Sequence, residues 1–187
     1  PNSEQTSSFE LKKIVLRGMK NCEGCIYAPG ESSYSLSGEA KQDLSEEYEA
    51  PVDVTTKSYV FGIILENSSR STVSGIEVNG VDSTAIATTG QGKATAIAEA
   101  FGVYLVDSDG NTVEHVSLGD VSSAAEATVK ESGDATAEAL SAGVYLKNSN
   151  ENVFKHISLD EVSVEATAKS PGETSTSTTE EVYRFFV

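Results

Sequence analysis

Gly102-Val-Tyr-Leu105 is the stretch of sequence that decides the fold, because it recurs at a nearly constant interval. Related stretches are Gly62-Ile-Ile-Leu65 and Gly143-Val-Tyr-Leu146. Fourteen residues after each glycine comes a second apolar pair: Ile76 and Val78, Val116 and Leu118, Ile157 and Leu159. The chain thus has a fixed period of about 41 residues, which is typical of a solenoid or an array of repeats.

Each repeat carries four apolar positions at spacings of three, two and three residues. At helical spacing these positions scatter around the circumference and form no apolar stripe, so a helix is disfavoured. On extended chain the middle pair shares one face, and each spacing of three requires a bend that reverses the direction of the side chains. Short strands joined by corners are therefore expected. The positions are Val73, Ile76, Val78 and Val81, then Val113, Val116, Leu118 and Val121, then Phe154, Ile157, Leu159 and Val162.

Two kinds of turn separate the strands. One is polar, as in Asn67-Ser-Ser-Arg-Ser71, Asp107-Ser-Asp-Gly-Asn111 and Asn148-Ser-Asn-Glu-Asn152, and such residues tolerate unusual backbone angles. The other is centred on glycine, as in Gly90-Gln-Gly-Lys93, and is flanked by alternating alanines such as Ala94-Thr-Ala-Ile-Ala98. Inward-facing alanines predict a flat and thin cross-section at the glycine turn.

The predicted fold class is all-β, a parallel β-helix or β-solenoid with a repeat of about 41 residues. The alternative is an antiparallel β-sandwich with hairpin extensions. An extended repeat would run roughly 135 Å at about 3.3 Å per residue, which suggests too long a path for one compact turn. Two turns of about 20 residues per repeat are therefore favoured. One turn that carries an antiparallel hairpin at the glycine turn is the other possibility.

The glycine strands and the polar turns that follow them resemble the parallel β-helix repeats of surface proteins in the pectate-lyase-like superfamily. The resemblance rests on Gly62-Ile-Ile-Leu-Glu-Asn-Ser68 and its two later copies, and on Asn111-Thr-Val113; it covers residues 60–187. It implies the fold and leaves the activity open, because the superfamily contains both enzymes and structural proteins. The period of this chain is about twice the usual period of the repeats in that superfamily.

The two ends of the chain suggest two domains, 1–59 with an incomplete repeat and a cysteine-containing insertion, and 60–187 with the repeats and an orphan strand. Leu11, Ile14, Leu16 and Met19 have the apolar spacing of the repeat without its glycine strand. Glu181-Val-Tyr-Arg184 stands where the next glycine strand would begin. We therefore expect head-to-tail assembly into a filament or surface layer, in which the last strand of one subunit completes the first half-repeat of the next. The expected interface residues are Leu11, Ile14, Leu16, Met19, Val182, Tyr183, Phe185, Phe186 and Val187.

The composition limits the partners. Thirteen basic residues against 29 acidic ones give a formal charge of −16, which repels nucleic acid and anionic lipid. No apolar run approaches the roughly 20 residues of a membrane-spanning helix. The chain itself is the expected partner, with cations or surface glycans as further possibilities. The composition is typical of exported proteins, and we expect a mature form from which a signal has been removed, with a trimmed initiator methionine as the alternative. Asn67-Ser-Ser69 is a glycosylation sequon.

No residue pattern indicates catalysis or a cofactor, so the protein is expected not to be an enzyme. Cys22-Glu-Gly-Cys25 is interpreted as a disulfide, because a zinc site would need further ligands. His115 and His156 occupy equivalent positions, expected roughly 9.6 Å apart on the surface. Asp107-Ser-Asp-Gly-Asn111 is interpreted as a polar turn, with weak calcium binding as the alternative. A carbohydrate-binding or carbohydrate-active β-helix and a monomeric adhesin module are the rival functions. Tyr104, Tyr145 and Tyr183 align as the first would require, but packing explains them more simply, because Ile64 occupies the same position of the motif.

Overall fold

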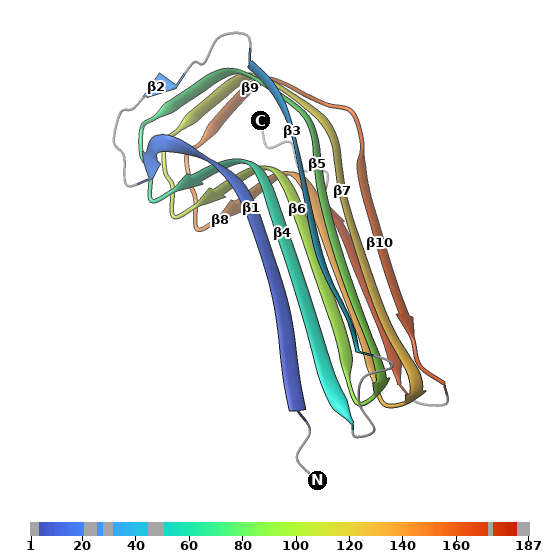
Figure 1. Ribbon diagram of the computed structural model, residues 1–187. Coiled ribbons are helices and arrows are strands. Elements are labelled where there is room, and N and C mark those ends of the chain that lie inside the picture. The colour runs from blue at the N-terminus through green and yellow to red at the C-terminus, as the bar shows by residue number, and fades with distance from the viewer. Residues whose placement is uncertain (1–3, 21–25, 28–31, 45–50, 172–173, 183–187) are drawn as a thin grey trace.

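The computed structural model describes residues 4–20, 26–27, 32–44, 51–171 and 174–182, and this part of the chain consists of strands and turns with no helix. The strands form two sheets that face each other, and the chain crosses between the sheets at both ends of the strands (Figure 1). Sheet A contains, in spatial order, β1 (Glu4–Lys20), β4 (Val52–Glu66), β6 (Ala94–Val106), β8 (Ala135–Lys147) and β11 (Ser175–Val182). Sheet B contains β2 (Ile26–Tyr27) and β3 (Ser32–Leu44), then β5 (Thr72–Gln91), β7 (Thr112–Ser132), and finally β9 (Val153–Leu159) and β10 (Val162–Lys169).

Every pairing between the described strands is parallel, as the predicted fold class requires and the antiparallel alternative does not. Val54 lies opposite Ala94, and Ala94 lies opposite Ala135, so neighbouring strands are separated by one whole repeat of the sequence. The prediction of two compact turns per repeat is therefore wrong. The length argument failed because the chain runs along sheet B and back along sheet A, which makes a long, flattened path. The glycine turn connects the two sheets and forms no hairpin within either of them.

The apolar ladders predicted from the repeat are confirmed in register. Val73, Ile76, Val78 and Val81 on β5 lie opposite Val113, Val116, Leu118 and Val121 on β7. The next set continues this alignment on β9 and β10. These side chains meet Ile63, Leu65, Val103 and Leu105 from sheet A in one buried cluster. We call this cluster the wide core. It lies at the end of the strands that is next to the polar turns.

Two local features produce the bends that the ladder spacing required. Gly75, His115 and His156 have φ values of 71°, 51° and 50°, which reverses the direction of the side chains between the first two ladder positions. On sheet A, a Cβ on Gly102 would lie 2.6 Å from the carbonyl oxygen of Gly143. The backbones of successive repeats are thus too close at this point for any side chain. We call the three equivalent glycines of sheet A the glycine row: Gly62, Gly102 and Gly143.

The predicted alanine-rich half is confirmed as a second buried cluster, the thin core. Ala85 and Ala87 on β5 face Ala94, Ala96 and Ala98 on β6, and all five are fully buried. Ala125, Ala127, Ala135 and Ala137 repeat the arrangement one strand further on. Small side chains on both inner faces let the two sheets approach closely, as the sequence predicted.

The polar turns form ladders of hydrogen bonds from one repeat to the next. The Ser68 amide donates to Oγ of Ser108 at 3.0 Å, and the Ser108 amide donates to Oγ of Ser149 at 3.0 Å. Asn67, Asp107 and Asn148 begin these turns with φ near 50°, a conformation that asparagine and aspartate tolerate. Ser68 and Ser108 are buried, so the ladders satisfy backbone groups that water does not reach.

The predicted place of the N-terminal segment is wrong. Leu11, Ile14, Leu16 and Met19 were expected in a ladder equivalent to β5, but they lie on β1 in sheet A, where Leu11 is opposite Tyr59. The ladder positions of sheet B are taken instead by β3, with Tyr34 opposite Val78. The N-terminal repeat therefore has its sheet A strand. The spacing of these four residues resembles the ladder, but long-range pairing decides the sheet.

Candidate functional site

The two outer strands of sheet A are the candidate site. β1 and β11 stand at opposite ends of this sheet, and the described part of the chain supplies no strand beyond either of them. Each outer strand pairs through one edge, β1 with β4 and β11 with β8. An unpaired parallel edge presents a row of amides and carbonyls to which another strand can bind.

The register of β11 shows which amides face outward. Ala135 donates from its amide to the carbonyl of Thr174 at 3.0 Å and lies opposite Ser175. In a parallel ladder the amides of every second residue point to the same neighbour, so the amide of Thr176 points to β8. The amides of Ser177 and Thr179 consequently point away from β8, toward the open edge.

Both outer strands carry polar residues in register columns whose inner-strand members are buried. One column contains Val54, Ala94 and Ala135 on the inner strands, and the residues at its two ends are Thr6 and Ser175. Sequence analysis missed this feature, because it appears only when the inward columns of all five strands are compared.

The column with the strongest contrast runs through Lys12, Val60, Ala100, Ser141 and Glu181. Its three inner members are completely buried. Its two end members are residue types of opposite charge. The same register column is therefore basic at one end of sheet A and acidic at the other.

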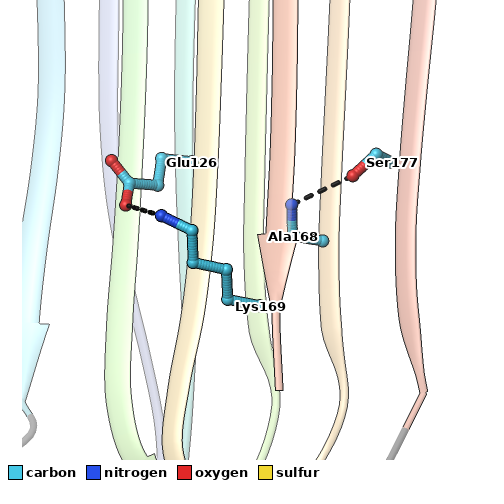
Figure 2. Close-up of polar contacts among 4 residues, drawn as sticks. All are labelled: Glu126, Ala168, Lys169 and Ser177. Carbon is cyan, nitrogen blue, oxygen red and sulfur yellow. Dashed lines mark hydrogen bonds and ion pairs between the residues drawn. The ribbon is translucent and has the colours of Figure 1, made fainter. Parts of the chain in front are cut away.

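On β11 the polar side chains have a visible role. Ser177 stands opposite Ala137, and its Oγ accepts a hydrogen bond of 3.0 Å from the amide of Ala168 on β10 (Figure 2). Ser175 and Thr179 likewise replace alanines, and all three side chains are exposed. Sheet A thus extends one strand beyond sheet B, and Ser177 satisfies an amide of the outer strand of sheet B. On the outer face of sheet B, Lys169 forms an ion pair of 3.6 Å with Glu126.

The wide core is open on the side of β9. Val153 is 44% exposed, and Phe154, Ile157 and Leu159 are only partly buried, whereas the counterparts of these three on β7 are buried. This end of the core therefore presents apolar surface among the described residues.

An aromatic cluster lies on the outer face of sheet A. Tyr104 and Tyr145 stack with parallel rings 5.5 Å apart, and Phe61 stacks on Phe101 at 5.3 Å. Phe101 also contacts Tyr104, with ring centroids 5.0 Å apart. The strands of sheet A bend near one end (Figure 1). Aromatic contacts of this kind contribute about 0.5–1.5 kcal/mol beyond the area that they bury, so the cluster stabilises this part of sheet A.

Glu99 is the carboxyl group most affected by its environment among the described residues. Burial raises the pKa of the Glu99 carboxyl above its usual value of 4.5, and the Glu138 carboxylate raises it further; Lys147 and Lys57 act in the opposite direction. A pocket of about 160 Å³ beside it is lined by both carboxylates and by apolar and hydroxyl side chains, among them Ile97, Leu140 and Thr178. The described lining contains no cationic side chain, thiol or aromatic ring.

The expected distance between the two histidines is wrong. His115 and His156 lie on neighbouring turns of the chain, and their rings stack with centroids 4.6 Å apart and planes 14° apart. Parallel rings direct their nitrogen lone pairs side by side, so one metal ion cannot bind both of them well. Among the described residues, no group of three or more His, Cys, Asp or Glu side chains is arranged to hold a metal ion.

The acidic side chains of the loop that begins at Asp107 contact the next repeat. Oδ1 of Asp107 accepts a hydrogen bond of 3.2 Å from Nδ2 of Asn148, and Oδ1 of Asp109 accepts one of 2.6 Å from the Asn150 amide. These contacts agree with the interpretation as a polar turn. Weak calcium binding stays a prediction.

The remaining predicted site residues lie in a polar turn, on β11 or outside the described part of the chain. Asn67 is exposed in its turn, and its glycosylation stays a prediction. Val182 lies on β11 opposite Ala142 of its own chain, and Glu181 lies opposite Ser141, two residues from the predicted alignment with Gly143. The predicted site residues outside the described part of the chain are Cys22, Cys25, Tyr183, Phe185, Phe186 and Val187.

The described residues contain no helix that is long and apolar enough to cross a bilayer.

Comparison with known proteins does not identify a family for this chain. No protein-family model, no curated protein and no solved structure matches this chain, and its resemblance to surface β-helix repeats stays a prediction.

Proposed function

We propose that this chain is a noncatalytic β-solenoid that assembles head to tail into a filament or layer outside the cell or on its surface. Each coil of the solenoid would contain about 41 residues, the period of the sequence. The parallel registers support the solenoid, because each strand of sheet A pairs with the equivalent strand of the next repeat. The acidic, serine- and threonine-rich composition supports a place outside the cell.

The observation that carries the proposal is the pair of open edges of sheet A. A parallel sheet that ends on β1 at one side and β11 at the other can continue from one molecule into the next with the same strand direction. Such a contact joins two different surfaces and therefore builds a chain of subunits unless the rotation closes a ring. Main-chain hydrogen bonds supply affinity in strand addition.

The mode of joining differs from the one expected from the sequence. The tail strand does not fill a missing strand of the neighbour, because β1 already occupies sheet A. It adds β11 to β1 of the next subunit, so that sheet A is continuous. Within the described residues sheet B has four strand positions against five in sheet A, and it is interrupted at the junction. Ser175, Ser177 and Thr179 face this interruption, and their hydroxyl groups suit a junction that water can enter.

The test is to block the open edge of β11. Thr179→Pro removes an amide that points outward and keeps the amides that point to β8. The variant should remain folded by circular dichroism and stay monomeric at concentrations at which the wild type forms filaments in electron micrographs. Thr179→Ala keeps the amide and should assemble normally. Filaments of unchanged length from the proline variant would refute assembly through this edge.

A second candidate function is a monomeric module with capped ends. The polar columns of β1 and β11 favour it, because repeat proteins need polar terminal units to remain soluble. The two functions predict different results when molecular mass is measured over a range of protein concentrations. The average mass of a filament-forming protein increases with concentration, whereas the mass of a monomeric module does not change.

A further inference from the structure

We propose that β11 pairs with β1 of the next subunit in the register of the inner strands, so that Glu181 lies directly opposite Lys12 of the next copy. This inference rests on the proposed function and specifies its interface. The partner is a second copy of this chain, bound through a defined set of backbone and charge contacts.

The register follows from the inner strands of sheet A. Ala94 lies opposite Val54 and Ala135, and Ser175 continues the same column on β11. At the other end of the sheet, Val54 lies opposite Thr6. If the next copy continues this column, its Thr6 pairs with Ser175, and six residues further along its Lys12 pairs with Glu181. The strands would be about 4.8 Å apart, as in any sheet.

The charges of the two strands are complementary. Four of the thirteen basic residues of the chain lie on β1, against two acidic ones, in a protein whose formal charge is −16. β11 contains Glu180 and Glu181 and no basic residue. Two copies of β1, or two copies of β11, would repel each other, whereas β1 and β11 attract. The charges thus select the head-to-tail contact over either symmetric one.

The position of the two charges in their column strengthens this argument. The inner members Val60, Ala100 and Ser141 are completely buried, so the column belongs to the inward face of the sheet. Residues directly opposite each other on neighbouring strands interact, and opposite charges at such positions attract. In the isolated molecule Lys12 and Glu181 belong to the two opposite outer strands of sheet A. At the junction they become neighbours.

Charge reversal tests the register. Lys12→Glu and Glu181→Lys each create two like charges at every junction, and each variant alone should raise the concentration needed for assembly about tenfold. An equimolar mixture of the two variants should assemble like the wild type. When the two variants alternate along the filament, every junction pairs opposite charges. Glu181 of the Lys12→Glu variant meets Lys12 of the Glu181→Lys variant, and at the next junction the two substituted residues meet each other. The double variant Lys12→Glu/Glu181→Lys should also assemble, because its junctions carry the reversed pair.

Two control variants make the same charge changes away from the outer strands. Lys93→Glu and Glu77→Lys alter exposed residues at the glycine turn and on β5, and neither should move the concentration needed for assembly. Each variant is first checked for a wild-type circular dichroism spectrum. If the wild type assembles and folded single variants assemble equally well, the register is wrong while the proposed function stands. If the wild type never assembles, both proposals fail. If the single variants fail to assemble and the mixture does not rescue them, the pairing of these two residues is refuted.

Discussion

Nδ2 of Asn111 donates a hydrogen bond of 3.1 Å to Oδ1 of Asn152, which occupies the same place one repeat later. Asn111 also accepts a bond of 3.0 Å from the Ser71 amide and donates one of 3.0 Å to the Ser68 carbonyl. Its side chain is completely buried and spans three successive turns. This single amide therefore ties together the polar ends of three repeats.

Replacement of Asn111 should be strongly destabilising. Asn111→Ala leaves the Ser71 amide and the Ser68 carbonyl without partners in a buried turn, at a cost of about 2–4 kcal/mol. For a chain of this size the melting temperature should fall by roughly 5–15 °C. Thermal unfolding followed by circular dichroism measures the loss. Asn150→Ala, an exposed position of the next turn, is the control and should change stability little. Equal melting temperatures for both variants would contradict the role of the ladder.

The glycine row should tolerate no side chain. In Gly102→Ala the new Cβ would lie 2.6 Å from the Gly143 carbonyl oxygen and 2.7 Å from Cδ1 of Leu118. Two backbones and the wide core must then move apart, at a cost of about 1–3 kcal/mol. Gly80→Ala is the matched control, because its Cβ would meet no atom closer than 3.7 Å. Urea unfolding should separate the two variants, and equal midpoints would mean that the sheets adapt more freely than the backbone contacts suggest.

Glu99→Gln should stabilise the protein at neutral pH. Because burial raises the pKa of Glu99 in the folded state, ionisation is easier in the unfolded chain, and stability falls as the pH rises from about the usual value of 4.5 through the raised pKa. Glutamine does not ionise, so the variant escapes this loss. Its advantage should be largest near neutral pH and disappear well below the usual pKa. Glu77→Gln, on the exposed outer face of sheet B, serves as the control. An advantage of Glu99→Gln that persists at low pH would contradict the electrostatic explanation.

The cysteine pair should resist alkylation until it is reduced. Cys22 and Cys25 are close enough in sequence for a short disulfide loop, which an exported protein would retain. Mass spectrometry after iodoacetamide treatment, with and without a reductant, measures the number of free thiols. Full labelling of the unreduced protein would rule out the disulfide.

The features predicted correctly from the sequence depend on local patterns. The ladder residues Ile76 and Val116 and the inward alanines each follow from spacing within a few residues, whereas the close backbone approach that requires the glycine row is seen only in the structure. The polar turns were recognisable for the same reason, because Asn67 and Asp107 adopt backbone angles that few other residues tolerate.

The incorrect predictions all concern long-range pairing. The length of an extended repeat does not reveal whether the chain makes one flattened turn or two compact ones, and the distance between His115 and His156 was wrong for the same reason. Leu11 was placed in the wrong sheet because its spacing imitates the ladder. Only the pairing of β1 with β4 decides its position. The polar columns of the outer strands became visible only after that pairing was known.

Sedimentation velocity of the intact chain over a wide range of concentrations tests the central claim most directly. Assembly through the open edges of sheet A predicts species whose masses are successive multiples of 19.7 kDa and whose average size grows with concentration. A single species of 19.7 kDa at every concentration would contradict the account and would favour a monomeric module with capped ends.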